Sequence, residues 1–272
     1  MPKFARSIGA TQSACTGGAG MLSSATWFST VSVNRLMKKT FLLLAVATFT
    51  TWQIAAAADI TGVITLKGTP PAEADIGPKM TEASPDCAAM YDPAKMPTTH
   101  FYSVGAKGEF ADVVVSLNVT GKSTGASAPP AVLDQKGCVY SPTIFAVQTG
   151  QKIIVKNSDP CVHNVHPKPT VAGNEESNQV QMSGGADLTF TFDKPEPFLK
   201  FQCDVHPWMF AWVTVVDSPY FSVSDKDGKF TIKNVPPGKY TIQAAHRKLG
   251  VQTAEVEVKD GNVTQDFTFE VK

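Results

Sequence analysis

The sequence predicts an all-β protein built of β-sandwiches. Apolar and polar residues alternate with a period of two in short runs, Pro and Gly separate the runs, and hardly any stretch has helical periodicity. Runs of this length and spacing are typical of β-sandwiches. The first group of candidate strands comprises Ile60–Leu66, Ala111–Leu117, Ile144–Val147, Lys152–Asn157, Asp187–Phe192, Phe198–Cys203 and Ala211–Val216.

Two segments interrupt this pattern. Residues 70–101 are rich in Pro, Ala and Met and lack alternation, so we expect a long loop with a short helix near Met90. Residues 121–130 combine Ser, Gly, Ala and Pro and predict a second loop.

A domain boundary is expected near Asp217. Beyond it, four more alternating runs are separated by Asp-Gly and Pro-Pro-Gly turns. Residues 59–217 are therefore predicted to form one domain with an amino-terminal extension, and residues 218–272 a second, small β domain.

The first 58 residues are predicted to lie outside the folded body. Two lysines precede an apolar stretch, and four alanines then precede Asp59, which is the order of a secretory signal peptide. The apolar stretch is about half the roughly 20 residues needed to span a bilayer. We expect a signal peptide at residues 37–58, a periplasmic or secreted mature protein, and no membrane span after cleavage. Residues 1–36 are interpreted as a non-native upstream extension, because they precede a complete signal.

Removal of residues 1–58 changes the net charge. This stretch holds five basic residues and no acidic ones, so 19 basic and 24 acidic residues remain, a net charge of −5. A surface of this charge disfavours nucleic acids and anionic membranes, which reward clustered Lys and Arg.

The strongest chemical signal is the run Phe201-Gln-Cys203-Asp-Val-His206-Pro-Trp-Met209, which lies between two candidate strands. It offers a thiolate, an imidazole and a thioether on one short loop, and this combination selects copper over magnesium or calcium. A second imidazole is available about forty residues earlier, in the run Cys161-Val-His163-Asn-Val-His166. Two histidines and one thiolate with a weak axial methionine form a blue copper site.

These two runs resemble the copper sites of the cupredoxin family, of plastocyanin and, more closely, amicyanin. The resemblance covers roughly residues 105–217 and implies a cupredoxin-like Greek-key β-sandwich. It implies one type 1 (blue) copper ion held by His163, Cys203, His206 and Met209, and a role for Asn164 in bonding the two ligand loops to each other. It also implies that His206, with Pro207, Trp208 and Pro160, forms the surface through which electrons pass.

The carboxyl-terminal part resembles another family. The run from Asp227 to Ile242, with its Pro-Pro-Gly turn, is similar to the carboxypeptidase regulatory-like, transthyretin-like β-sandwich. The two parts together look like bacterial methylamine utilisation-like proteins, in which a cupredoxin is fused to such a sandwich.

Four cysteines lie beyond residue 58, and they allow three full pairings that sequence cannot separate. If Cys203 binds copper, we expect Cys87 to pair with Cys138 and Cys161 to stay free. The alternative is a Cys161–Cys203 disulfide, which would leave no thiolate for a metal. Met209 could instead be a core residue. His166 could replace His163 as a ligand, belong to an additional copper site, or be a solvated histidine at a strand edge.

Electron transfer with a transient redox protein partner is the predicted function, and we expect no enzymatic activity. The trinuclear copper cluster of an oxidase would require H-x-H motifs, and the sequence contains none. A binuclear copper site would require two cysteines in the ligand loop, and this loop has one. Two other functions remain open: a copper store or chaperone, and an adhesive or carbohydrate-associated module without a redox role. His100 and His246 are expected to be structural.

Overall fold

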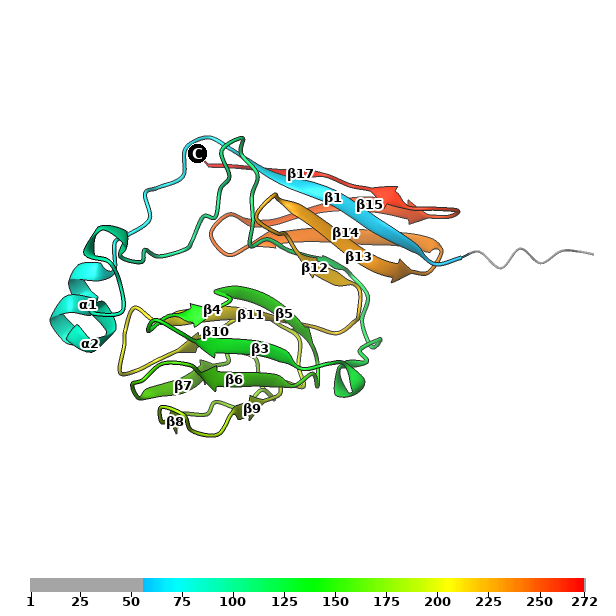
Figure 1. The fold of residues 1–272 in the computed structure, drawn as a ribbon. Coiled ribbons are helices and arrows are strands. Elements are labelled where there is room, and N and C mark those ends of the chain that lie inside the picture. The colour runs from blue at the N-terminus through cyan, green and yellow to red at the C-terminus, as the bar shows by residue number, and fades with distance from the viewer. Residues whose placement is uncertain (1–55, 272) are drawn as a thin grey trace, which may run out of the picture. The chain divides into compact units, whose positions relative to one another are not determined.

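The computed structural model describes residues 56–271, and nearly all of its regular structure is β-strand (Figure 1). This confirms the predicted all-β class. Two separate groups of buried apolar side chains mark the cores of two β-sandwiches. The expected upstream extension, and the expected signal peptide apart from residues 56–58, lie outside the described residues. No helix in residues 56–271 is long and apolar enough to cross a membrane.

The first sandwich has two sheets. One has the strand order β5-β11-β10-β7-β8 and the other β4-β3-β6-β9. Their bounds are β5 Ile144–Gln148, β11 Phe210–Val216, β10 Glu196–Gln202, β7 His163–Lys168, β8 Gln179–Gln181, β4 Tyr140–Ser141, β3 Ala131–Gln135, β6 Ile153–Asn157 and β9 Leu188–Phe190.

Aromatic residues fill the core between these sheets. Phe201 of β10 is completely buried, and its ring lies 5.6 Å from that of Phe190 and 6.0 Å from that of Phe192, both edge-on. Such edge-to-face pairs stabilise a core beyond the area they bury. This packing fixes β10, the strand that leads into the Cys203 loop.

The second sandwich also has two sheets. One is centred on β1, which pairs with β13, β16 and β17, and the other has the order β12-β2-β14-β15. The bounds are β1 Ala58–Lys67, β13 Lys229–Val235, β16 Val263–Thr264, β17 Phe267–Glu270, β12 Phe221–Val223, β2 Val114–Leu117, β14 Gly238–His246 and β15 Gly250–Val258.

The expected division of the chain at residue 217 does not describe this second sandwich. Strands β1 and β2 come from the segment that we assigned to the first domain, yet β1 pairs with β13 and β17, and β2 pairs with β12 and β14. Figure 1 shows β1 in the same sandwich as β13 and β17. Ile60, Ile64 and Leu66 point into its core from β1, whose burial alternates along the strand. At Gly228, φ is +71° and an added Cβ would lie 2.3 Å from the Ile64 oxygen, so the turn before β13 requires glycine.

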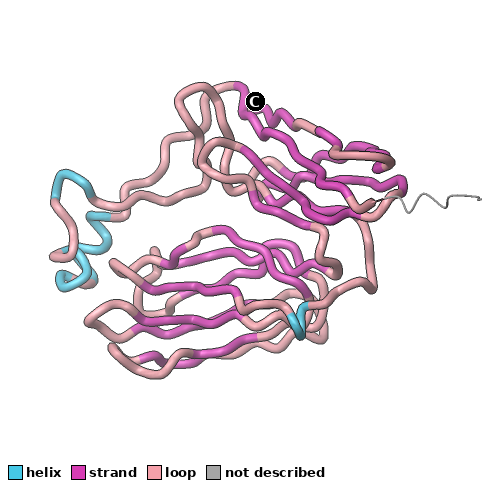
Figure 2. Tube along the Cα trace, turned by 45° about the vertical axis from the view of Figure 1, so that its right-hand side comes forward, coloured by secondary structure: helices cyan, strands magenta, loops and turns pink. Residues whose placement is uncertain are grey.

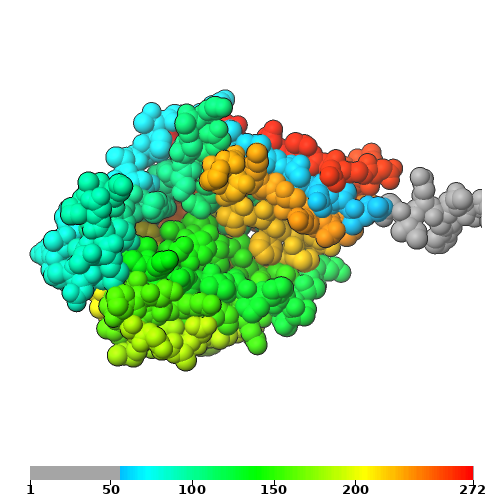
Figure 3. Space-filling model, in the orientation of Figure 1, coloured from blue at the N-terminus to red at the C-terminus, as the bar shows by residue number. Residues whose placement is uncertain are grey.

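The expected long loop at residues 70–101 contains more helix than predicted. Helices α1 (Gly77–Ala83) and α2 (Pro85–Ala88) precede Met90, and the 3₁₀ turn η1 (Pro93–Lys95) follows it (Figure 2). A proline lies in the first turn of all three, where its missing N–H costs no helical hydrogen bond. Ile76, Met80 and Cys87 are buried within the first core, so this segment packs against the first sandwich (Figure 3). The second expected loop contains only the 3₁₀ turn η2 (Gly125–Ser127).

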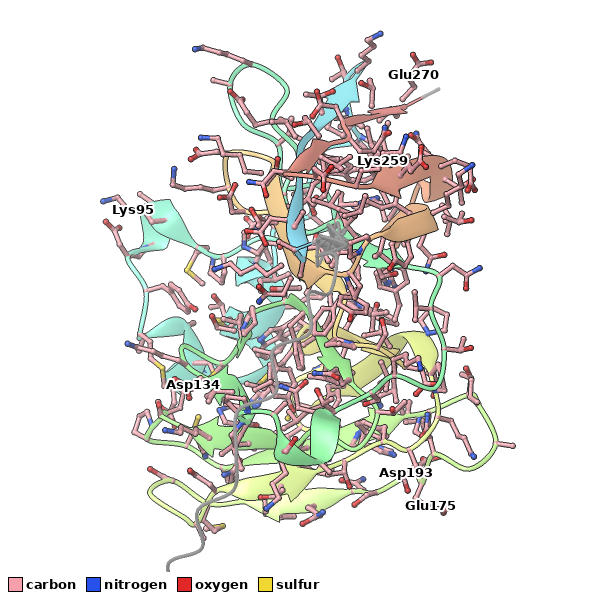
Figure 4. All side chains as sticks on the ribbon, turned by 90° about the vertical axis from the view of Figure 1, so that its right-hand side faces the viewer. Lys95, Asp134, Glu175, Asp193, Lys259 and Glu270 are labelled. Atoms are coloured by element: carbon pink, nitrogen blue, oxygen red, sulfur yellow. A yellow bond between two sulfur atoms is a disulfide. The ribbon has the colours of Figure 1, made fainter. Side chains whose placement is uncertain are left out.

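Charged side chains lie at the periphery of both sandwiches. Glu175, Asp193, Lys259 and Glu270 are exposed and point outward from the ribbon (Figure 4). The polar residues relevant to chemistry are instead buried at one end of the first sandwich, where the β6–β7 and β10–β11 connections meet.

Candidate metal centre

Two connections in the first sandwich carry the predicted ligands. His163 is the first residue of β7, directly after the β6–β7 connection, and Cys203 directly follows β10. Strands β7 and β10 are hydrogen-bonded neighbours, with Gln202 opposite His166, so the ends of these connections lie side by side. The sheet pairing therefore brings together residues that are forty positions apart in the sequence.

The Cys203–Met209 loop is closed by backbone hydrogen bonds. The amide of Cys203 donates to the carbonyl of Met209 at 3.1 Å, and the amide of Met209 donates to that of His206 at 2.8 Å. The next pair, Gln202 and Phe210, belongs to the β10–β11 ladder. This geometry holds the three predicted ligands of the loop in one tight turn.

Three donor atoms converge at this end. His163 Nδ1 lies 2.9 Å from His206 Nδ1, and Cys203 Sγ lies 3.7 Å from His206 Nδ1. His163, Cys203 and His206 each offer a ligand atom within 4.8 Å of the others. Their exposed fractions are 0%, 2% and 4%. Two imidazoles and a thiolate that face one another at this distance form a donor set that suits a copper ion.

Met209, the fourth predicted ligand, is buried with 1% exposure in the same core. Its place in the closed loop is compatible with an axial thioether. Its burial would be the same for a core residue, so the axial role remains a prediction.

The hydrogen bonds at this centre favour a thiolate. Burial alone would raise the pKa of Cys203, but hydrogen bonds with His163 and His206 and with the Asn164 backbone outweigh it and lower the pKa to about 6. For His163, burial alone would lower the pKa, and hydrogen bonds with Asp159 and Cys203 raise it instead. The protein therefore favours the thiolate that metal binding requires.

Asp159 orients the His163 ring. Its Oδ2 accepts from His163 Nε2 at 2.9 Å, and its carboxylate also accepts from the amides of Gly137 at 2.6 Å and Cys138 at 2.8 Å. A proton on Nε2 leaves the Nδ1 lone pair free for a metal. Sequence reasoning missed Asp159. The only available signal was its position four residues before His163, in a turn-like Asn-Ser-Asp-Pro run.

Asn164 joins the two ligand loops, as the resemblance implied. Its Oδ1 accepts from the amides of Asp204 at 2.6 Å and Val205 at 3.3 Å, and lies 3.2 Å from Cys203 Sγ. His166, the alternative ligand, is placed differently. Its ring nitrogens bond to Asp204 at 2.7 Å and Glu176 at 2.8 Å, so it belongs to a surface ion-pair group rather than to the three donors.

The expected disulfide between Cys87 and Cys138 is confirmed, and Cys161 and Cys203 are the free cysteines of the described residues. The alternative Cys161–Cys203 bridge is therefore absent from this structure. The position of the Cys87–Cys138 disulfide explains why His206 does not reach the surface. Cys87 Sγ lies 3.5 Å from His206 Nε2, so the disulfide covers the edge of the ring that was expected to reach the surface.

The expected electron-transfer surface is thus only partly exposed. Pro160 and Pro207 are exposed, whereas His206 and Trp208 are buried. Trp208 packs with its ring 5.3 Å from that of His206 and donates from Nε1 to the Cys138 carbonyl at 3.0 Å. His246, expected to be structural, is buried in the second sandwich and bonds to the Phe101 carbonyl at 2.9 Å.

The fold and the donor set together define an all-β protein with a copper-binding domain. Residues 131–216 match the family of copper binding proteins described as plastocyanin/azurin, and this region is a cupredoxin domain. Residues 220–271 match the second β-sandwich domain of BOS complex subunit NOMO1-like proteins. No curated protein matches the chain.

Three solved structures illustrate what the chain is similar to. A Cu(I) amicyanin variant is 19% identical, with 37% of this chain and 97% of that chain covered and a TM-score of 0.29. A purple cupredoxin from Nitrosopumilus maritimus is 22% identical, with 31% and 98% covered and a TM-score of 0.27. A copper-containing nitrite reductase from Thermus scotoductus SA-01 is 20% identical, with 37% and 25% covered and a TM-score of 0.29.

Proposed function

We propose that this protein is an exported type 1 copper protein that transfers electrons and turns over no substrate. The observation that carries the proposal is the convergence of His163 Nδ1, His206 Nδ1 and Cys203 Sγ in a buried site. The cupredoxin family match supports copper as the metal. Met209 is the proposed axial ligand, and one copper ion is the proposed content of the site.

Copper would supply one-electron redox chemistry at this site. The chain itself holds the donor atoms in fixed positions and excludes water from them. Asp159 retains the proton on His163 Nε2, Asn164 ties the Cys203 loop to β7, and the surrounding core excludes water. Ligands held in this way would change little when the charge of a bound copper ion changes, which would keep the energy of reorganisation small.

A transient redox protein is the proposed partner. The exposed Pro160 and Pro207 flank the buried ligands, and the contact surface would include the α2 segment that covers His206. Small interfaces of this kind suit a carrier that must release its partner. Export to the periplasm or beyond is proposed from the signal-like residues 37–58 and is compatible with the disulfide.

The resemblance of the second sandwich to transthyretin-like domains, and of the whole to methylamine utilisation-like proteins, remains part of this proposal. The family match of residues 220–271 supports a β-sandwich in this region.

The test is the visible spectrum of the purified full chain after addition of one equivalent of Cu(II). We expect an intense thiolate-to-copper charge-transfer band that is absent from Cys203→Ser. Cys161→Ser is the matched control, because it removes a thiol that is not among the three converging donors, and it should keep the band. Tight binding of Cu(I) without the band in oxidised protein would favour a copper store. No copper binding by the wild type would refute the proposal.

A further inference from the structure

A second group of sulfur atoms lies beside the metal centre. The Cys87–Cys138 disulfide has a third cysteine next to it, since Cys161 Sγ lies 3.6 Å from Cys138 Sγ. Cys161 is a free thiol and is half-buried. A free thiol in contact with a disulfide is the arrangement from which thiol–disulfide exchange starts.

The sulfur group also contacts both ligand histidines through the nitrogens that face away from the metal centre. Cys161 Sγ lies 3.6 Å from His163 Nε2, and Cys87 Sγ lies 3.5 Å from His206 Nε2. Each imidazole thus points Nδ1 at the metal centre and Nε2 at a sulfur atom, Cys161 Sγ for His163 and Cys87 Sγ for His206. The Cys87–Cys138 bond therefore fixes the sulfur that rests against His206.

We propose that Cys87, Cys138 and Cys161 form an intramolecular thiol–disulfide exchange site. The Cys161 sulfur gives up its proton and attacks Cys138 Sγ. A Cys138–Cys161 bond forms, the Cys87–Cys138 bond breaks, and its electron pair leaves with Cys87, which takes up a proton. One thiol and one disulfide are present before and after the step, so no external oxidant or reductant is required.

Contacts at the leaving and shared sulfurs favour this direction of attack. Ser84 Oγ donates a hydrogen bond to Cys87 Sγ at 3.1 Å, and a donor at the leaving sulfur stabilises the charge that develops there. Cys138, the sulfur shared by both pairings, is held on the opposite side. Its amide donates to Asp159, and its carbonyl accepts from Trp208. The shared sulfur is therefore fixed, while the leaving sulfur lies on the four-residue helix α2.

The exchange would change the cover over His206. In the Cys87–Cys138 form, the disulfide holds the Cys87 sulfur against Nε2 of that ring. In the Cys138–Cys161 form, no covalent bond holds α2 there. Core packing of Met80 and the Tyr91 hydroxyl bond to the Gly137 carbonyl at 2.7 Å would then hold the segment. The site therefore links cysteine pairing to access to a ligand histidine.

Disulfide mapping of the copper-free full chain tests the proposal, so its outcome is independent of copper binding. The folded protein is held under non-reducing, mildly alkaline conditions, alkylated, acidified and digested with pepsin, which prevents further exchange. We expect two populations: one with Cys87–Cys138 and label on Cys161, the other with Cys138–Cys161 and label on Cys87. Cys203 and Cys15 are not part of the proposed exchange, and their alkylation is measured separately on the peptides that contain them.

Two variants and a dilution series make the result decisive. Cys161→Ser should show Cys87–Cys138 alone, with no label on Cys87. Cys87→Ser should form the Cys138–Cys161 disulfide on mild oxidation, which shows that these sulfurs can meet. The rate of exchange in the wild type should not depend on protein concentration. Label on Cys161 alone after prolonged incubation, two persistent thiols in Cys87→Ser, or a rate proportional to concentration would each overturn the proposal.

Discussion

The carboxylate of Asp159 and the imidazole of His163 form a buried pair in which Oδ2 accepts from Nε2 at 2.9 Å. The same carboxylate accepts from the amides of Gly137 and Cys138, which belong to the loop of the disulfide. One side chain thus fixes the tautomer of a proposed copper ligand and anchors the neighbouring disulfide loop. Its negative charge lies on the side of the ring that faces away from the donor atoms.

Replacing Asp159 by Asn should raise the reduction potential of the copper-loaded protein. The amide oxygen can still accept from His163 Nε2 and from the Cys138 amide, whereas the bond from the Gly137 amide and the charge that stabilises Cu(II) more than Cu(I) are lost. If the preference for Cu(II) falls about tenfold, the potential rises by roughly 60 mV. Voltammetry measures this shift, and Asp193→Asn, at an exposed position, is the control for loss of a charge. An unchanged potential would show that Asp159 does not act on the metal through His163.

Replacing Asn164 by Ala should destabilise the copper-free protein by about 1–3 kcal/mol, because the amides of Asp204 and Val205 lose their acceptor. Urea unfolding measures this change. Asn178→Ala is the control, since Asn178 is exposed and touches the same network with its side chain alone, accepting from Asn164 Nδ2 at 2.6 Å and donating to the Asp204 carboxylate at 2.8 Å. Equal effects of the two substitutions would argue against a special role for the bridge between the ligand loops.

Residues 218–272 should not fold when they are produced alone. Strands β13 and β17 would lack β1, and β12 and β14 would lack β2, which leaves apolar faces and backbone groups without partners. We expect a poorly dispersed amide spectrum by nuclear magnetic resonance. The full chain serves as the comparison, and a dispersed spectrum for the isolated segment would show that β1 and β2 are dispensable.

His246 should make the protein less stable as the pH falls. Burial is the main reason why the pKa of this group is lowered to about 4 from an ordinary value of 6.5. Between these values the unfolded chain binds a proton that the folded protein rejects. The associated stability is therefore complete above about pH 6.5 and is lost as the pH falls towards 4, to a total of about 3 kcal/mol.

The measurement for His246 is urea unfolding as a function of pH. In His246→Gln the side-chain amide can still donate to the Phe101 carbonyl but does not titrate. The stability of the wild type relative to this variant should therefore be constant above about pH 6.5 and fall by about 3 kcal/mol as the pH falls towards 4. If the difference in unfolding free energy between wild type and variant did not change with pH, His246 would not cause the loss of stability at low pH.

Local patterns predicted much of the fold. The alternation of residues 60–66 and 152–157 corresponds to β1 and β6, because the side of a strand that faces a core is set by a period of two. The spacing within the Cys203–Met209 run likewise reflects a single tight turn, which short-range hydrogen bonds close. The helices before Met90 were underestimated because the Pro-rich segment has too few residues for a periodic pattern.

The sequence by itself therefore determined the all-β class, the types and order of the candidate ligands, and the cysteines available for pairing. The tertiary structure decided which strands share a sandwich, because pairing is non-local: the hydroxyls of Thr65 and Thr268 meet at 3.0 Å across 203 positions. It also decided that Asp159 bonds to His163 and that three sulfurs gather beside both histidines. Contacts of this kind depend on how loops from different strands meet at the end of a sandwich, and no local period or spacing encodes that meeting.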